Sequence, residues 1–400
     1  MKKTFFIILA LSVYLFANQD VVIKQILNNL KSKYASDSRV SVFNYTINSS
    51  TDTIKINLEI EKELEIVTVL LVDSLKQYKI TNYELQIEKL PNVDLNNKFF
   101  GVVTLSVANG RAKPSHASEM VTQALLGTPA KVLKKSVNGD WYFVKLPDNY
   151  LCWIEDESIT LMDSTEFYKW CSLPKIIFLP EYGHCYEKPK INSYYVSDLV
   201  VGNILSIIGE QNNFVKVLFP DGREAFIKKN ETKRLEEWVK ESKITAENLI
   251  KTGKRFLGQP YLWGGTSSKG LDCSGFVKTT FFINGVILQR DASQQALYGA
   301  EINDITDISE DFNKLEPGDL LFWGRKPSNI VTHVGMYIGN GKYIHSSGKV
   351  KINSFDSRDK IFLQRLVKIF IKAKRYIGNV GSEGIEPITN NYLFQYYFKK

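Results

Sequence analysis

The chain has 400 residues, enough for two to four domains at roughly 100 to 200 residues each. Hydrophobic residues make up 44% and charged residues 24%, a composition that excludes a disordered chain, a collagen and a polytopic membrane protein. Lysine and arginine outnumber aspartate and glutamate by 51 to 43. The resulting net charge of +8 is scattered along the chain instead of forming one basic stripe, so no nucleic-acid partner is expected.

The first 17 residues have the form of a secretory signal peptide. Lys2 and Lys3 precede a mostly apolar stretch at 5–16, and Ala17 then precedes polar residues. A membrane anchor is the alternative, but this stretch is shorter than the roughly 20 residues that a helix needs to cross a bilayer. We therefore expect a secreted or periplasmic monomer that has no integral membrane segment once the signal peptide (1–17) is cleaved.

Helical and alternating patterns follow the signal peptide. Residues 20–95 combine a helical pattern at 21–33, an alternating strand pattern at 53–60 and a second helical stretch at 61–76. This order predicts a small α+β domain, and it contains no residue types that point to catalysis.

Short strands separated by turns fill residues 98–165 and again residues 173–232, which predicts two small β-barrels in tandem. Helical periodicity from residue 231 to 254 introduces a last domain at 240–377, and residues 378–400 form a tail without a usable pattern. The predicted fold class is therefore α+β with several domains.

Four cysteines are present, Cys152, Cys171, Cys185 and Cys273. An exported chain permits disulfides. If Cys273 is a nucleophile, three cysteines remain and at most one disulfide forms among them. Cys171 with Cys185 is the pair we expect, and unpaired structural thiols are the alternative.

One of these cysteines stands where a helix is expected to begin. The segment PYLWGG (260–265) ends in a glycine turn, and Asp272 then precedes Cys273 and the apolar helical pattern CSGFVKTTFFI. Unpaired N–H groups and the positive end of the helix dipole at this position favour a thiolate, the form that acts as a nucleophile. Asp272 can cap the same helix. For a lone cysteine, a buried structural thiol is the alternative.

Two of the four histidines lie twelve residues apart on one predicted hairpin. His333 begins one strand, and His345 ends the next one. A two-residue loop at 340–341 sets His345 opposite Met336 and puts the imidazoles on opposite faces. A three-residue loop sets His345 opposite Gly335, on the face of His333. Joint action of the two histidines requires the second register.

The motifs PYLWGG, LDCSGF, THVGMYIG and YIHS together resemble the NlpC-type family of papain-like cysteine peptidases, which act on bacterial cell-wall peptides. The resemblance implies a papain-like α+β domain in which Cys273 is the nucleophile, His333 the general base and His345 the residue that orients the imidazole. A thiol and imidazole pair needs such a third group to fix the ring tautomer. The Cys273 backbone N–H and the Tyr261 hydroxyl are the expected oxyanion donors. No cofactor or metal is implied.

A closer resemblance includes the first barrel. RAKPSHASE (111–119), followed by VTQALLG, and NYLCWI (149–154) look like the first of two bacterial SH3-like barrels in secreted γ-D-glutamyl-L-diamino acid endopeptidases of wall-peptide recycling. The resemblance implies murein-derived peptides as substrates, with Glu119 facing the ammonium group of an N-terminal L-alanine and Tyr150 as its aromatic neighbour. A carboxylate there would reject peptides whose amine carries a sugar. The remaining expected substrate contacts are Tyr261, Asp272, Ser274 and Asp291.

Several alternatives stay open. A lytic hydrolase of intact peptidoglycan would keep its first barrel remote from Cys273, and a non-catalytic wall-binding protein would carry a degenerate peptidase domain. A zinc site could use Cys273 and the two histidines, although no fourth ligand is evident. The stretch 365–376 could lie on a membrane surface as a basic amphipathic element, but we expect a closing strand or helix of the last domain.

Overall fold

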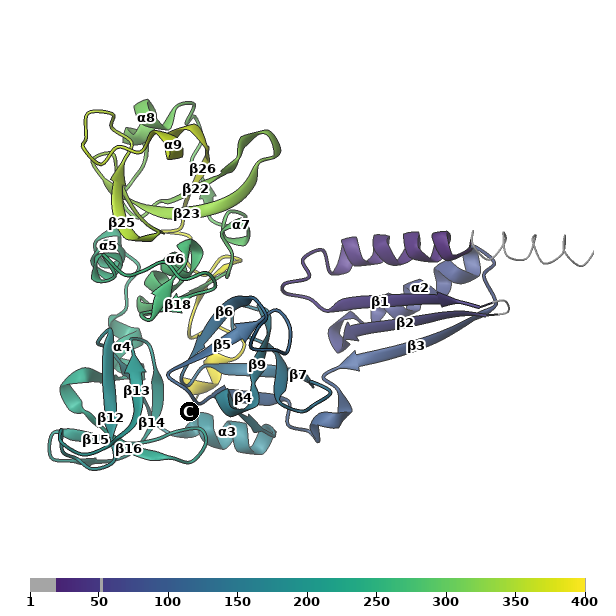
Figure 1. Ribbon diagram of the computed structural model, residues 1–400, viewed down its shortest axis with the longest axis horizontal. Coiled ribbons are helices and arrows are strands. Elements are labelled where there is room, and N and C mark those ends of the chain that lie inside the picture. The colour runs from purple at the N-terminus through teal and green to yellow at the C-terminus, as the bar shows by residue number, and fades with distance from the viewer. Residues whose placement is uncertain (1–18, 51–52, 400) are drawn as a thin grey trace, which may run out of the picture. The chain divides into compact units, whose positions relative to one another are not determined.

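The structure is a computed structural model that describes residues 19–50 and 53–399 (Figure 1). The expected signal peptide lies outside these residues. The chain divides into two units, 1–96 and 97–400, each with its own internal packing. Among the described residues, no helix is long and apolar enough to span a membrane.

The first unit is a small α+β domain, as the sequence predicted. Residues 19–34 are helical. In the sheet order β1-β2-β3, the middle strand pairs antiparallel with β1 and parallel with β3. Alternate β2 residues such as Ile54 and Ile56 are buried in one apolar cluster with α2 and the first helix. The elements are β1 (Phe43–Ser49), β2 (Ile54–Glu61), α2 (Ile66–Gln77) and β3 (Tyr83–Leu90).

The second unit opens with a domain that we call the first β-domain. It is a seven-stranded antiparallel sheet in the order β10-β4-β7-β8-β9-β5-β6. Residues 101–107 divide between β4 and β5. The strands are β4 (Phe100–Val103), β5 (Val107–Arg111), β6 (Met120–Leu125), β7 (Pro129–Lys135), β8 (Trp141–Lys145), β9 (Leu151–Glu155) and β10 (Ile159–Met162).

A helix, α3 (Ser164–Ser172), leads to the second β-domain, which also has seven antiparallel strands, in the order β13-β12-β16-β15-β14-β11-β17. Asp163 and Glu166 form a capping box at the start of α3, which ends the first β-domain and starts the connection. The strands are β11 (Lys175–Phe178), β12 (Tyr182–Tyr186), β13 (Tyr195–Val200), β14 (Ile204–Gln211), β15 (Phe214–Leu218), β16 (Glu224–Lys228) and β17 (Thr232–Arg234).

The last domain begins with two helices, where the sequence indicated one helical stretch. These are α4 (Leu235–Glu241) and α5 (Ala246–Arg255). The break arises because Thr245 caps α5, its hydroxyl accepting the Asn248 N–H at 3.2 Å. The short strands β18 (Thr266–Ser267) and β19 (Gly270–Leu271) then lead into α6 (Cys273–Ile283).

A six-stranded sheet in the order β21-β26-β22-β23-β24-β25 forms the body of this domain. Residues 365–376 form most of α9 and all of β26, an inner strand, so this stretch closes the domain as expected. The further elements are β20 (Val286–Leu288), α7 (Ala292–Gln295), β21 (Ala300–Glu301), α8 (Ile308–Asp311), β22 (Leu320–Arg325), β23 (Ile330–Gly339), β24 (Lys342–Ser347), β25 (Lys349–Ser354), α9 (Gln364–Lys368) and β26 (Phe370–Arg375).

Residues 378–399, for which the sequence showed no pattern, fold back over the second unit. Their strand β27 (Ile385–Pro387) pairs with β20. The Asn391 side chain donates to the Pro147 carbonyl at 2.8 Å, and the buried Tyr397 hydroxyl donates to the Gly127 carbonyl at 2.7 Å. This segment therefore joins the last domain to the first β-domain.

Candidate active site

The start of α6 is built around Cys273. Asp272 caps the helix as predicted, its Oδ1 accepting the Gly275 N–H at 2.7 Å. A side chain at Gly275 would put a Cβ 2.0 Å from the Gly265 carbonyl oxygen, so glycine is required for the PYLWGG turn to lie against the helix. Cys273 is presented at this helix end with 7% of its surface exposed.

The hairpin that carries the two histidines combines a two-residue loop with a β-bulge. Both residues of the 340–341 loop have positive φ, +52° and +70°, as a type I′ turn requires. A register shift at Ile338 then moves the pairing by one residue. His345 consequently lies opposite Gly335, on the face of His333. The prediction that only a three-residue loop gives this register was wrong, because it left out the bulge.

The structure brings the two histidines into direct contact. His333 Nε2 and His345 Nδ1 are 2.7 Å apart, and the ring of Trp323 packs 5.3 Å from the His333 ring, centroid to centroid. His345 is fully buried, and its Nε2 lies 3.0 Å from Oδ1 of Asn353 on β25. The sequence did not single out Asn353, because nothing in its own segment marks it as a partner of His345.

The Cys273 thiol lies against β23, the strand that carries His333, in one buried cluster with Val334, and the Val334 backbone N–H partly offsets the rise of the thiol pKa. Among the described residues, no hydrogen bond joins the thiol to the His333 ring, which is common for catalytic pairs in unliganded enzymes. Tyr261, the other expected oxyanion donor, lies within electrostatic range of the thiol. Burial, together with Cys273 and Asp272, raises the pKa of Tyr261 above its usual range, so this hydroxyl keeps its proton.

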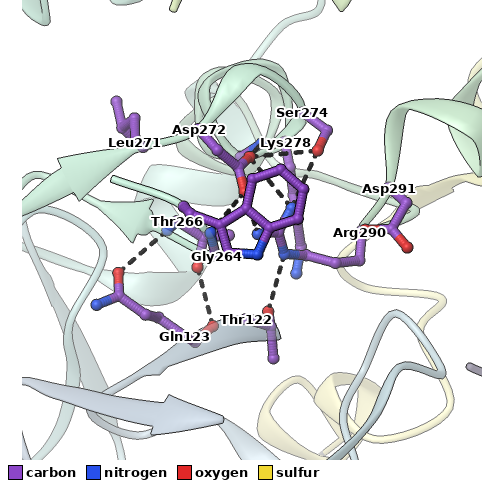
Figure 2. A network of polar contacts seen from close by, with 12 residues as sticks. Thr122, Gln123, Gly264, Thr266, Leu271, Asp272, Ser274, Lys278, Arg290 and Asp291 are labelled. Carbon is purple, nitrogen blue, oxygen red and sulfur yellow. Dashed lines mark hydrogen bonds and ion pairs between the residues drawn. The ribbon is translucent and has the colours of Figure 1, made fainter. Parts of the chain in front are cut away.

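Figure 2 shows a buried network of polar contacts beside the helix start. The Arg290 guanidinium binds the Asp272 carboxylate at 2.5 and 3.2 Å and the Ser274 hydroxyl at 3.0 Å. Its Nε donates to the Thr122 hydroxyl of β6 at 3.2 Å. Asp272 and Ser274, both expected to contact substrate, are only 5% and 4% exposed. Sequence reasoning missed Arg290, whose only signal was its place directly before Asp291.

The two residues expected to recognise the substrate amine lie at the boundary between the first β-domain and the last domain. Glu119 is exposed, and its Oε1 accepts the indole N–H of Trp263, in the PYLWGG segment, at 2.7 Å. The Tyr150 hydroxyl lies 3.2 Å from Oδ2 of Asp291. Both contacts join segments more than a hundred residues apart in sequence.

The same boundary is held by buried contacts. The Thr266 hydroxyl donates to the Gln123 carbonyl at 2.9 Å, and the Thr266 N–H donates to the Gln123 side chain at 3.1 Å. A buried ion pair joins Lys278 of α6 to Asp148. The first β-domain therefore packs against the helix that carries Cys273, unlike the remote barrel that the lytic alternative predicts.

Comparisons with known proteins agree with this geometry. Residues 258–371 match the NlpC/P60 family model, and residues 110–159 match the bacterial dipeptidyl-peptidase Sh3 domain. A γ-D-glutamyl-L-lysine dipeptidyl-peptidase of Bacillus cereus is 31% identical over 241 residues, which cover 58% of this chain and 68% of the relative. The chain belongs to the NlpC/P60 family of cell-wall cysteine peptidases.

Two further relatives match more of the NlpC/P60 chain. Dipeptidyl-peptidase 6 of Lysinibacillus sphaericus is 28% identical over 273 residues, covering 66% of this chain and 95% of the relative. The crystal structure of an NlpC/P60 family protein from Bacillus cereus superposes with a TM-score of 0.58 at 25% identity, covering 69% of this chain and 99% of that structure. Both matches extend well beyond the length of the peptidase domain, which agrees with the observed α+β multi-domain fold.

In the NlpC/P60 site, burial opposes the charged forms of both the thiol and the imidazoles, whereas the helix end favours a thiolate. Burial, and then the Asp272 carboxylate, raise the pKa of the Cys273 thiol to about 12. Burial and the neighbouring His345 ring lower the pKa of His333 to about 3, and burial lowers the pKa of His345 to about 4. Burial of the sulfur outweighs the helix end, which does favour the thiolate.

We therefore expect the rate of Cys273 alkylation by iodoacetamide to keep rising with pH through the neutral and alkaline range. A thiol with a pKa of about 12 gains thiolate continuously over that range, whereas a preformed thiolate and imidazolium pair would give a constant rate from acidic pH upward. Mass spectrometry of Cys273 between about pH 5 and pH 10 measures this rate. A plateau from the acidic end would contradict the raised thiol pKa.

The remaining cysteines do not form the expected disulfide. All four thiols are free and buried. Cys171 lies on α3 in one apolar cluster and Cys185 on β12 in another, so the two side chains belong to separate cores. The alternative of unpaired structural thiols is the correct one. Within the described ranges, no group of three or more histidine, cysteine, aspartate or glutamate side chains is arranged to hold a metal ion.

Proposed function

We propose that this protein is a cysteine endopeptidase that cleaves the γ-D-glutamyl-L-diamino acid bond of murein peptides with a free N-terminal L-alanine. The observation that carries the proposal is the position of Glu119, an exposed carboxylate hydrogen-bonded to Trp263 in the segment that leads to α6. Glu119 lies on the first β-domain. Hydrogen bonds from Arg290 to Thr122 and to Asp272 join this domain to the start of α6. The similarity to a γ-D-glutamyl-L-lysine dipeptidyl-peptidase of Bacillus cereus supports the same bond.

In the proposed reaction, His333 takes the proton of the Cys273 thiol as the sulfur attacks the γ-carbonyl carbon of D-glutamate. The tetrahedral intermediate collapses when the His333 imidazolium gives this proton to the leaving α-amine of the diamino acid. The L-Ala-D-Glu half remains as a thioester on Cys273. A water molecule, deprotonated by His333, then hydrolyses the thioester and restores the free thiol and the neutral imidazole. Burial opposes the thiolate and the imidazolium, which suits this order, since the charges appear only when substrate is attacked.

Two hydrogen-bond donors are proposed to stabilise the oxyanion of the tetrahedral intermediate. The Cys273 backbone N–H belongs to the first turn of α6, where N–H groups have no acceptor within the helix. The Tyr261 hydroxyl keeps its proton because its pKa is raised. Both can donate to the oxygen that becomes negative in the tetrahedral intermediate.

The proposed specificity depends on charge at the amine end of the substrate. An ammonium group beside Glu119 gains a charge-assisted hydrogen bond, and the Tyr150 and Asp291 pair is proposed to complete this end of the site. A peptide whose alanine nitrogen is acylated by a muramic acid residue carries no charge there and adds bulk. The protein would thus act outside the cytoplasm on released peptides, after removal of the signal peptide proposed at residues 1–17.

The deciding experiment compares purified protein on L-Ala-γ-D-Glu-diamino acid and on the same peptide linked to N-acetylmuramic acid. We expect cleavage of the free peptide alone. Equal cleavage of both peptides would contradict the proposed amine recognition, and cleavage of sacculi in preference to either would favour the lytic alternative.

Replacing Glu119 by glutamine is expected to lower kcat/KM for the free peptide by about 10- to 100-fold, the value of one hydrogen bond to a charged group. The loss should appear mainly in KM, since the reacting groups are unchanged. Glu157→Gln is the matched control, because Glu157 is an exposed carboxylate of the same domain with no side-chain role in the site. Unchanged kcat/KM in Glu119→Gln would remove this residue from the proposal.

A further inference from the structure

Asn353 makes two hydrogen bonds that fix its orientation beside the histidine pair. Its Nδ2 donates to the Ile361 carbonyl at 2.9 Å, in the segment that precedes α9. Because a carbonyl oxygen only accepts, the amide nitrogen must face Ile361 and the amide oxygen must face His345. The Oδ1 of Asn353 is 3.0 Å from His345 Nε2. A flipped amide would turn its oxygen toward the Ile361 carbonyl oxygen and lose that hydrogen bond.

This orientation determines the tautomer of both neutral rings. An amide oxygen accepts, so His345 carries its proton on Nε2 and leaves a lone pair on Nδ1. That lone pair lies 2.7 Å from His333 Nε2, which must therefore carry the proton of the His333 ring. His333 Nδ1 is left with a free lone pair. The proton positions along the chain Ile361, Asn353, His345 and His333 thus follow from one backbone carbonyl.

We propose that Asn353 is a positioning residue that holds His345 and His333 in the tautomers that make His333 Nδ1 the base for Cys273. The inference rests on the proposed role of His333 and adds a fourth residue behind the two histidines. Asn353 touches neither the thiol nor the expected substrate contacts, so it acts only through His345.

The surroundings of His345 explain why a neutral amide suits this position. The charged groups that act on the ring are Lys351, paired directly across the strands β24 and β25, and Arg365 of α9. The other titratable groups against this ring are His333 and Tyr343, whose ring lies 5.3 Å from that of His345, centroid to centroid. Two cations and burial oppose a charge on His345, so a neutral acceptor fixes the ring without requiring it to ionise.

The test compares Asn353→Leu, which removes the acceptor, with Asn353→Asp, which keeps an acceptor oxygen. We expect Asn353→Leu to lower kcat by about 100-fold with little change in KM, less than the roughly 10⁴-fold that a wrong tautomer costs when the lost group touches the base itself. Asn353→Asp should recover at least about tenfold of this loss. Asn303→Leu, an exposed asparagine of the same domain, is the matched control and should behave as the unchanged protein.

A second measurement separates this inference from the proposed function. Nitrogen-15 NMR of histidine side chains reports the tautomer without substrate, and the protein has only four histidines. His345 should be protonated on Nε2 in the unchanged protein and in Asn353→Asp, and should populate the Nδ1–H form in Asn353→Leu. An unchanged tautomer in Asn353→Leu, or no recovery by Asn353→Asp at equal melting temperature, would overturn the inference. Failure of the unchanged protein to cleave the peptide would count against the proposed function alone.

Discussion

Cys273→Ala is expected to abolish peptide hydrolysis, with a loss of about 10⁴-fold or more in kcat. The substitution removes the only sulfur at the start of α6 while leaving the helix cap on Asp272 intact. The replacement removes a single Sγ atom from a side chain that is 7% exposed, a small change in packing, so we expect the fold to be preserved. Turnover of the free peptide and the melting temperature together measure the two effects.

Cys185→Ala is the matched control for this loss. Cys185 is a buried free thiol in the core of the second β-domain, whereas His333 and His345 lie in the last domain. Its replacement should lower stability slightly and leave kcat unchanged. Full activity in Cys273→Ala, or equal losses in both variants, would show that the thiol of Cys273 is not the nucleophile.

Arg290→Met is expected to lower the free energy of unfolding by about 3 to 5 kcal/mol, because it leaves the buried Asp272 carboxylate without its cation. Arg290 and Asp272 are 1% and 5% exposed, so water cannot replace the lost partner. Peptide hydrolysis should fall as well, since Asp272 caps the helix that presents Cys273. Arg290→Lys keeps the positive charge but loses the bidentate geometry. Its free energy of unfolding should therefore lie between those of the unchanged protein and Arg290→Met.

Urea unfolding measures this cost, with Arg325→Met as the control. Arg325 is exposed, and its loss should change the free energy of unfolding by no more than about 0.5 kcal/mol. A double replacement of Arg290 and Asp272 by neutral residues should cost less than the sum of the two single replacements. Strict additivity would mean that the two groups do not depend on each other.

The features predicted from sequence are those with local causes. The start of α6 could be located because the cap, the glycine turn and the apolar period all lie within a few residues of Cys273. The α+β order of the first unit followed from helical and alternating periods in the same way. The pairing of His333 with His345 was foreseen as a requirement, but the bulge at Ile338 that delivers it was not, since no residue type marks a bulge there.

What the sequence could not reveal depends on contacts between distant segments. Arg290 binds Thr122 across 168 positions, and Asn353 acquires its role only when β25 lies beside β24. The raised pKa of the Cys273 thiol likewise reflects burial by the whole domain, which a helix-end argument does not include. The segment 378–399 showed no period because its order comes from partners elsewhere in the second unit.

The segment 378–399 also bears on the length of the proposed substrate. It pairs with β20, directly after the helix of Cys273, and it also binds Pro147 and Gly127 of the first β-domain. The span between Glu119 and the sulfur is consequently set by folded contacts on both sides. In the proposed reaction, this fixed distance selects the length of the substrate. A peptide bound by its N-terminal amine at Glu119 places the bond after its second residue at the sulfur. Peptides one residue shorter or longer would present the wrong atom.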